Sequence, residues 1–264
     1  MAEKQNSAFR LLHFCRRMVE QTPGNQTTAQ VLLRAFGEKG NSQTARQETV
    51  QVARVISLLS SEVELMIGES NRLGFSESSR QPIVNAFERF SISGLASQWQ
   101  ASRLPFVNAL PLLQIFAEGL GDEGALIAEP EIVSLSEAIG TLRLDVENSE
   151  LPDDVKQFVY EQLNLIERAV RDYPLAGAKA FKTAMREAIF HQADHVEAVE
   201  TLKKTKQMIT FKAIWRKVCD LSKYAIDASR LLTAGDEIYS HGQKVAHTAS
   251  EAMHHVGGII DHMK

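Results

Sequence analysis

Apolar residues recur at intervals of three and four along most of this chain, and this spacing restricts the fold more than any other feature of the sequence. It places apolar side chains on one face of an α-helix. No alternating run of β-branched residues is bounded by Asn-Gly or Asp-Gly, the pairs that favour β-hairpins. Hydrophobic residues make up 44% of the chain, enough for a substantial core. We therefore predict an all-α fold, a multi-helix bundle.

Proline, glycine and capping residues divide this pattern into separate helices. In the first half of the chain we expect helices near residues 8–20, 28–36, 42–72, 82–90, 95–102 and 111–118. In the second half we expect them near 132–146, 152–173, 175–204 and 208–232. The two around 132–146 and 152–173 read as an antiparallel hairpin, because Pro152 suits a first helical turn and Asp153 and Asp154 complement the positive end of the helix dipole.

The helical pattern is weakest between residues 118 and 130, where Gly119, Gly121, Gly124 and Pro130 are close together. Domain boundaries tend to fall in such segments. We predict an N-terminal helical bundle over residues 1–129, a C-terminal helical bundle over 130–232, and a histidine-rich tail over 233–264. The two bundles are expected to pack side by side.

The sequence also bears on where the protein works. The N-terminal segment is charged at both ends and lacks the apolar stretch of a signal peptide. No run of about 20 mainly apolar residues could span a membrane. The only cysteines, Cys15 and Cys219, lie in apolar periodic segments and are expected to be buried thiols rather than a disulfide or a zinc site. We expect an intracellular, cytoplasmic protein.

Positive charge is concentrated between residues 201 and 230, which contain eight basic and two acidic residues, although the whole chain carries a net charge of −4. On a helix that advances about 100° per residue, four of the basic side chains share an arc of about 40°. Apolar residues cluster on the other side of the same helix, and Trp215 lies beside them. The basic stripe consists of Lys212, Arg216, Lys223 and Arg230.

Several functions suit a basic stripe on an amphipathic helix. It could present charge to an acidic protein, follow the phosphates of nucleic acid, or lie on an anionic membrane surface, for which Trp215 would be well placed. It could also be the solvated outer face of an ordinary bundle helix. The stripe and Trp215 are our candidate partner-binding residues, and a second copy of this chain is another candidate partner because long amphipathic helices often self-associate.

Histidines suggest a second kind of site. Glu187, His191 and His195 are spaced four apart, so a helix would place them on one face, where they could bind a metal ion. The metalloprotease pattern needs a glutamate directly after the first histidine, and Gln192 stands there instead. These three residues could equally form a solvated helix face. Five further histidines in the predicted tail could bind a metal or simply remain polar: His241, His247, His254, His255 and His262.

Catalytic signatures are scarce. The sequence contains no phosphate-binding loop, no Gly-x-Ser-x-Gly elbow and no dinucleotide fingerprint. Arg186 and His191 have the Arg-x4-His spacing found in some helical ribonucleases, although Glu187 replaces the usual polar residue after the arginine. We expect no cofactor and no enzymatic activity, and we keep a metal-dependent or ribonuclease-like enzyme as the third hypothesis.

The segment 132–177, with its core LPDDVKQFVYEQLNLIERAVRDYPLAG, resembles uncharacterised all-helical bacterial proteins found near mobile elements and phage-defence genes. The resemblance covers less than a fifth of the chain and implies a setting in bacterial defence or stress, without any catalytic residue. The first hypothesis is therefore a non-enzymatic helical interaction or scaffold protein that docks a partner through its basic helix. The alternative is a membrane-acting effector whose basic amphipathic C-terminal helix binds anionic lipid.

Overall fold

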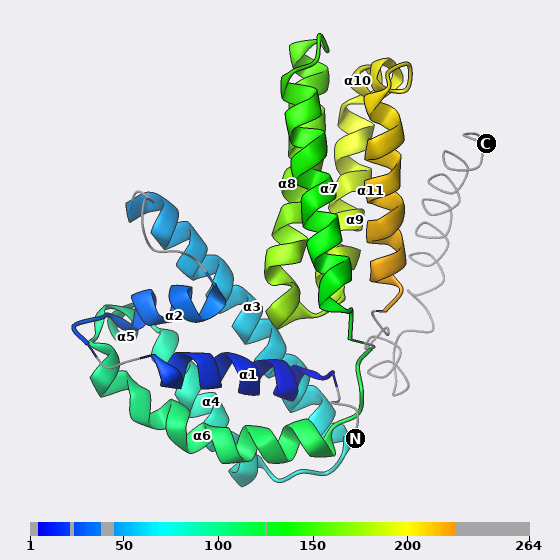
Figure 1. Cartoon of the computed structure of the whole chain (residues 1–264). Helices are drawn as coiled ribbons and strands as arrows, with labels where there is room; N and C mark the ends of the chain where they lie inside the picture. The colour runs from blue at the N-terminus through cyan, green and yellow to red at the C-terminus, as the bar shows by residue number, and fades with distance from the viewer. Residues whose placement is uncertain (1–4, 22–23, 38–44, 125, 225–264) are drawn as a thin grey trace.

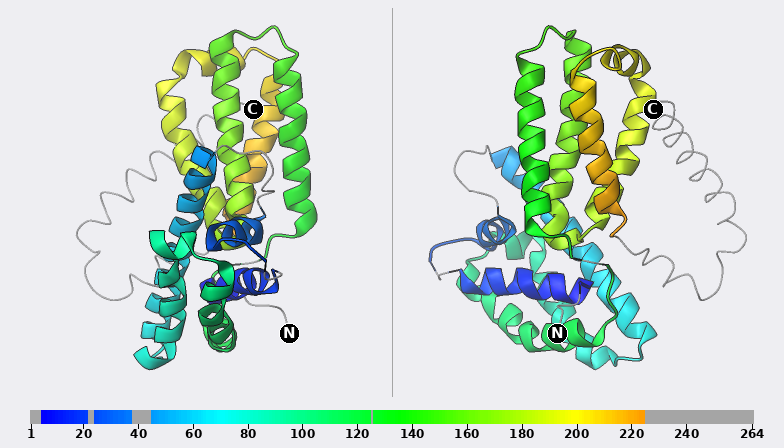
Figure 2. Two further views of the ribbon diagram at one scale, coloured as in Figure 1. Left: turned by 90° about the vertical axis from the view of Figure 1, so that its left-hand side faces the viewer. Right: turned by 45° about the vertical axis from the view of Figure 1, so that its right-hand side comes forward.

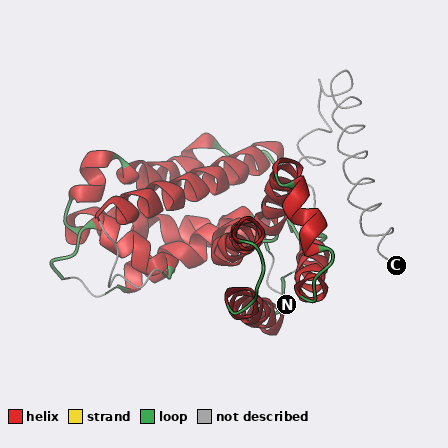
Figure 3. Ribbon diagram, turned by 90° about the horizontal axis from the view of Figure 1, so that it is seen from above, coloured by secondary structure: helices red, strands yellow, loops and turns green. Residues whose placement is uncertain are grey.

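The computed structural model of the chain describes residues 5–21, 24–37, 45–124 and 126–224. Over these ranges the chain forms α-helices and one short 3-10 helix, with no β-strand (Figure 3). The prediction of an all-α, multi-helix fold is confirmed. Every helix in the described ranges is too short or too polar to cross a lipid bilayer.

The first group of helices lies across the lower part of Figure 1 and surrounds one hydrophobic core. Its most extensive helix–helix contact is between α1 and α6. These two helices run antiparallel, because the Asn6 side chain at the start of α1 donates a hydrogen bond to the carbonyl of Ala117 near the end of α6. The elements of this group are α1 (Ser7–Glu20), α2 (Thr28–Phe36), α3 (Ala45–Arg72), α4 (Glu77–Phe87), the 3-10 helix η1 (Glu88–Phe90), α5 (Ile92–Ala96) and α6 (Trp99–Gly119).

The second group forms an up-and-down bundle of four long helices, which stand upright in Figures 1 and 2 and are seen nearly end-on in Figure 3. Each long helix contacts two others, so that the four enclose a second hydrophobic core. A short helix, α10, lies in the connection between the last two. The elements are α7 (Glu129–Glu147), α8 (Asp153–Ala176), α9 (Lys179–Asp194), α10 (Val196–Leu202) and α11 (Gln207–Ser222).

The two groups meet where α8 contacts α1 and α3. Leu175, near the end of α8, is fully buried in the first core rather than the second. The Tyr173 hydroxyl accepts a hydrogen bond of 2.9 Å from the backbone N–H of Ile127, which ties the connection between α6 and α7 to α8. The segment 118–130, in which we predicted a boundary, contains the end of α6, this connection and the start of α7.

Capping residues explain several helix ends. Thr27 and Gln30 form a reciprocal capping box at the start of α2, and Gly37 ends that helix with a positive φ of 96°. The predicted bounds of this helix, 28–36, agree with the structure. At the start of α1, the side chain of Asn6 accepts a hydrogen bond from the backbone N–H of Phe9.

Some predicted helix ends are wrong, and proline is the main cause. The helix expected to begin at Pro111 is instead the second half of α6, which continues through Pro105 and Pro111. Likewise, α8 continues through Pro174 to Ala176. The inward face of α6 is buried on both sides of its prolines, so packing outweighs the lost backbone hydrogen bonds. That face carries Phe106, Ala109, Leu113 and Phe116.

Two more predicted helices are shorter than expected. The helix predicted over 175–204 is divided into α9 and α10 at His195, whose backbone leaves the helical region with φ −124° and ψ 39°. The helix predicted over 208–232 ends at Ser222, and its last eight predicted residues, 225–232, lie outside the described residues, as does the predicted histidine-rich tail.

Candidate functional site

A groove between α9 and α11, closed at one end by α10, is the main candidate binding site that we describe. Its cavity has a volume of about 350 Å³. The floor is apolar and comes from four helices, α8 to α11. It contains Phe158, Met185, Ala188, Ile189, Val199, Leu202, Met208, Phe211 and Trp215.

The periodicity of α11 determines which of its residues reach the groove. Phe211, Ile214, Val218 and Leu221 are buried in the core of the second bundle. Lys212 and Trp215, each of which directly follows one of these buried residues in the sequence, are only half-buried and line the groove. Alternation of core-facing and groove-facing residues is expected of a bundle helix whose outer flank is not covered by another described helix.

Three of the four residues in the predicted basic stripe lie at this groove: Lys212, Arg216 and Lys223. The fourth, Arg230, lies outside the described residues. Trp215 also lines the groove, as do Asp220 and Cys219. The sequence placed the stripe on a side away from apolar residues, whereas the structure places it at the edge of an apolar surface. The floor could not be predicted from α11 alone because most of its residues come from α8, α9 and α10.

Two groups at the groove have raised pKa values. A 2.7 Å ion pair with Asp220 raises the pKa of Lys223. Burial raises the pKa of the Cys219 thiol. The prediction that both cysteines are buried thiols is confirmed for Cys15, which is completely buried in the first core, but is wrong for Cys219, which is only half-buried at the groove. Cys219 therefore stays a neutral thiol and is a poor nucleophile.

The predicted metal-binding residues are only partly brought together. Glu187 forms an ion pair with Arg168 of α8. His191 and His195 instead face Glu161 of α8, whose Oε2 atom lies 3.7 Å from His191 Nδ1 and 3.5 Å from His195 Nε2. The structure therefore brings the two predicted histidines to Glu161, whereas the predicted Glu187 is paired elsewhere. Glu161 could not be found from spacing within one helix, because it comes from the neighbouring helix.

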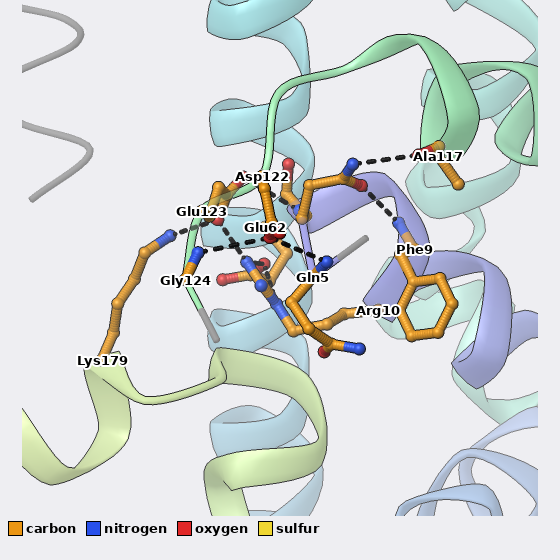
Figure 4. Close-up of polar contacts among 11 residues, drawn as sticks. Gln5, Phe9, Arg10, Glu62, Ala117, Asp122, Glu123, Gly124 and Lys179 are labelled. Carbon is orange, nitrogen blue, oxygen red and sulfur yellow. Dashed lines mark hydrogen bonds and ion pairs between the residues drawn. The ribbon is translucent and has the colours of Figure 1, made fainter. Parts of the chain in front are cut away.

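A second cluster of charges lies at the junction of the two bundles and was not predicted from the sequence (Figure 4). The Arg10 guanidinium donates from Nε to Glu62 at 2.8 Å and from an amino group to Glu123 at 2.6 Å. Lys179 of α9 donates to the same Glu123 carboxylate at 2.8 Å. The side chains of Arg10, Glu62 and Glu123 are at most 9% exposed. We call Arg10, Glu62, Glu123 and Lys179 the junction cluster.

Burial and charge act against each other in the junction cluster. Burial alone would raise the pKa of Glu123, but the positive charges of Arg10 and Lys179 lower it to about 2. Burial raises the pKa of Glu62, and the attraction of Arg10 offsets this only in part. Gly177 lies against the cluster with a φ of +59°, and a Cβ atom there would be 3.3 Å from the Arg10 guanidinium. Glycine therefore allows the chain to pass close to this cation.

Two polar groups in the second bundle lack the partners that the junction cluster has. Neither amide atom of Gln162, a completely buried residue of α8, has a hydrogen-bond partner among the described residues. The same is true of the indole N–H of Trp215 at the groove. Unpaired buried polar groups are uncommon in folded proteins. Both groups therefore differ from the charged side chains of the junction cluster, which are all paired.

The described residues that line the groove combine an apolar floor with charged side chains at its edge. An apolar floor with charged side chains at its edge is typical of surfaces that accept a peptide or another protein. Comparisons of the chain with protein-family models, with curated proteins and with solved structures found no match.

Proposed function

We propose that this chain is a non-enzymatic interaction protein that binds an acidic amphipathic helix of a partner protein in the groove between α9 and α11. The observation that carries the proposal is that an apolar floor and a basic edge occur in the same groove. Met208, Phe211 and Trp215 supply apolar surface, while Lys212 and Arg216 supply positive charge beside it. The proposed bacterial defence or stress setting is supported only by the resemblance of residues 132–177.

An amphipathic helix matches both properties of the groove. Its apolar residues, at spacings of three and four, would cover the floor and remove that surface from water. Acidic residues on the flanks of the same helix would lie near Lys212 and Arg216. Charge at the edge of an interface mainly accelerates association and selects partners, whereas burial of the apolar anchors supplies most of the affinity.

Nucleic acid fits the groove less well. Phosphate binding relies on many cationic contacts and little apolar surface. Here three basic side chains and the acidic side chain of Asp220 line the groove, and most of the lining residues are apolar. An acidic helix uses both the charge and the apolar floor, so it is the better match.

Anionic lipid is the second candidate, because large apolar side chains are exposed on the same two helices. Phe190 of α9 is 67% exposed and Ile209 of α11 is 75% exposed. Together with Lys212 and Arg216 they could insert into and pair with an anionic bilayer surface. Trp215 argues against this, because it is half-buried in the groove rather than projecting from it.

The proposal is tested by affinity purification from the native host after nuclease treatment, with three forms of the full chain. The groove variant carries Lys212→Glu and Arg216→Glu. The control carries Lys204→Glu and Lys206→Glu, which make the same change in net charge at exposed positions that do not line the groove. Circular dichroism shows whether each variant is folded.

We expect wild type and control to recover the same partner and the folded groove variant to lose it. A helical peptide from that partner should then protect the backbone amides of α9 and α11 from hydrogen exchange. Recovery of the same partner by all three forms would refute docking at the groove. Salt-sensitive binding to anionic vesicles with no protein partner would favour the lipid alternative.

A further inference from the structure

We infer that Glu161, His191 and His195 form a binding site for one Zn²⁺ ion, which we call the α8–α9 site. Their potential ligand atoms all lie within 4.8 Å of one another. Two of the separations, from Glu161 Oε2 to a histidine nitrogen, are 3.5 and 3.7 Å. This inference does not depend on the proposed partner helix.

These separations suit tetrahedral zinc. With metal–ligand bonds of about 2.0–2.2 Å, tetrahedral ligand atoms lie about 3.4 Å apart. The two carboxylate–imidazole separations are thus close to the spacing that an ion would require. Two imidazoles and one carboxylate are also a ligand set that zinc uses, whereas magnesium and calcium prefer oxygen ligands alone.

Neighbouring residues hold the ligands in place. Gln157 donates a 2.7 Å hydrogen bond to Oε1 of Glu161, which leaves Oε2 directed at the two histidines. The ring of His195 packs against Phe158, with ring centroids 5.7 Å apart. Orienting contacts of this kind are a regular feature of metal sites and contribute to their affinity.

His195 lies at the break between α9 and α10. Asp194 is the last residue of α9, and the backbone of His195 departs from helical geometry. His191 is still within α9 and approaches Glu161 through Nδ1, whereas His195 approaches it through Nε2. The helix end therefore gives the second imidazole a different direction from the first.

The site is open on one side. The side chains of His191, His195 and Glu161 are 44%, 37% and 28% exposed. Three protein ligands leave the fourth position of a tetrahedral ion to water or to a group from another molecule. Phe158 lines the groove and contacts His195, so a bound ion would stiffen the wall shared by the site and the groove.

The test must separate this site from the other histidines of the chain. It therefore uses the full chain in a background that replaces the five C-terminal histidines with glutamine, purified with a chelator and then dialysed. The replacements are His241→Gln, His247→Gln, His254→Gln, His255→Gln and His262→Gln. Zinc chloride is titrated into the protein by isothermal calorimetry, and thermal unfolding is followed with and without zinc.

We expect the background protein to bind one Zn²⁺ ion and to gain thermal stability from it. Glu161→Gln keeps the size of the side chain but removes a ligand charge, and should weaken binding by more than about 100-fold. Gln157→Leu, at an exposed position that only orients Glu161, should weaken it by about 10- to 100-fold. X-ray absorption of the loaded protein should show two imidazoles.

Glu187→Gln is the matched control, because it removes the same charge from the carboxylate that pairs with Arg168. It should leave zinc affinity unchanged. The inference is overturned if the background protein binds no zinc, or if Glu161→Gln and Glu187→Gln bind it equally well. Either result would mean that Glu161 only forms ion pairs with the histidines.

Discussion

The junction of the two bundles and the second bundle differ in whether their buried polar side chains have partners. At the junction, Arg10, Glu62 and Glu123 are nearly excluded from water and each has an oppositely charged partner. On the second bundle, the Gln162 amide and the Trp215 N–H are buried with no partner among the described residues. The comparison shows that the buried charges of the junction are paired within the fold, whereas these two polar groups of the second bundle are not.

Removal of Arg10 should have the largest effect. Arg10→Met keeps a long side chain but leaves Glu62 and Glu123 buried without their main partner. Breaking a buried ion pair in this way costs about 3–5 kcal/mol. We expect the free energy of unfolding in urea to fall by that amount.

Arg16→Met is the control for this change. Arg16 lies on the exposed side of the same helix, where it donates to Gln114 at 2.7 Å. We expect it to change stability by less than about 1 kcal/mol. Equal effects of the two substitutions would show that the junction cluster contributes little.

Glu123 gives the second prediction, which concerns pH. Its pKa in the folded protein is about 2, against an ordinary value of 4.5. Folding therefore favours the ionised form, so its stabilisation is complete above about pH 5 and is lost as the pH falls from about 4.5 to 2. At neutral pH a shift of this size corresponds to about 3 kcal/mol.

The measurement is the difference in unfolding free energy between wild type and Glu123→Gln from pH 7 to pH 2.5. Glu62 is present in both proteins, so the difference reports mainly on Glu123. We expect wild type to be more stable at neutral pH and the gap to narrow steadily in acid. A constant gap would show that Glu123 is not stabilised as a carboxylate.

Gln162→Leu should have the smallest effect, and one of opposite sign. If the buried amide has no partner, an apolar side chain of similar size should stabilise the second bundle by about 1–2 kcal/mol. Gln157→Leu, at an exposed position of the same helix, should leave the stability nearly unchanged. A loss of stability in Gln162→Leu would mean that the amide has a partner outside the described residues, and the contrast with the junction would disappear.

Local patterns in the sequence were sufficient to predict much of the fold. Apolar spacing with a capping box and a terminal glycine predicted both ends of α2, and the hairpin of α7 and α8 followed from a proline and acidic residues at a helix start. The expectation that proline would end a helix was wrong inside α6 and α8, because tertiary packing there compensates for the missing backbone donor.

The candidate sites were harder to predict because they combine distant residues. Periodicity identified Lys212, Arg216 and Lys223, but the groove they border requires α9. Glu161 is 30 or more residues from its histidines. Arg10 lies 52 residues from Glu62 and 113 from Glu123, and nothing near it in the sequence indicates either partner.

The separation between members of the junction cluster also affects the order of folding during synthesis. Arg10 leaves the ribosome before Glu62, well before Glu123, and Lys179 comes last. Until Glu62 and Glu123 have been made, α1 carries an unpaired cation on a buried face and cannot settle into its final contacts. The helices of the second bundle, by contrast, follow one another in sequence and can pair as they emerge. The first helix made therefore acquires its buried charge partners only when the last residues before the second bundle emerge.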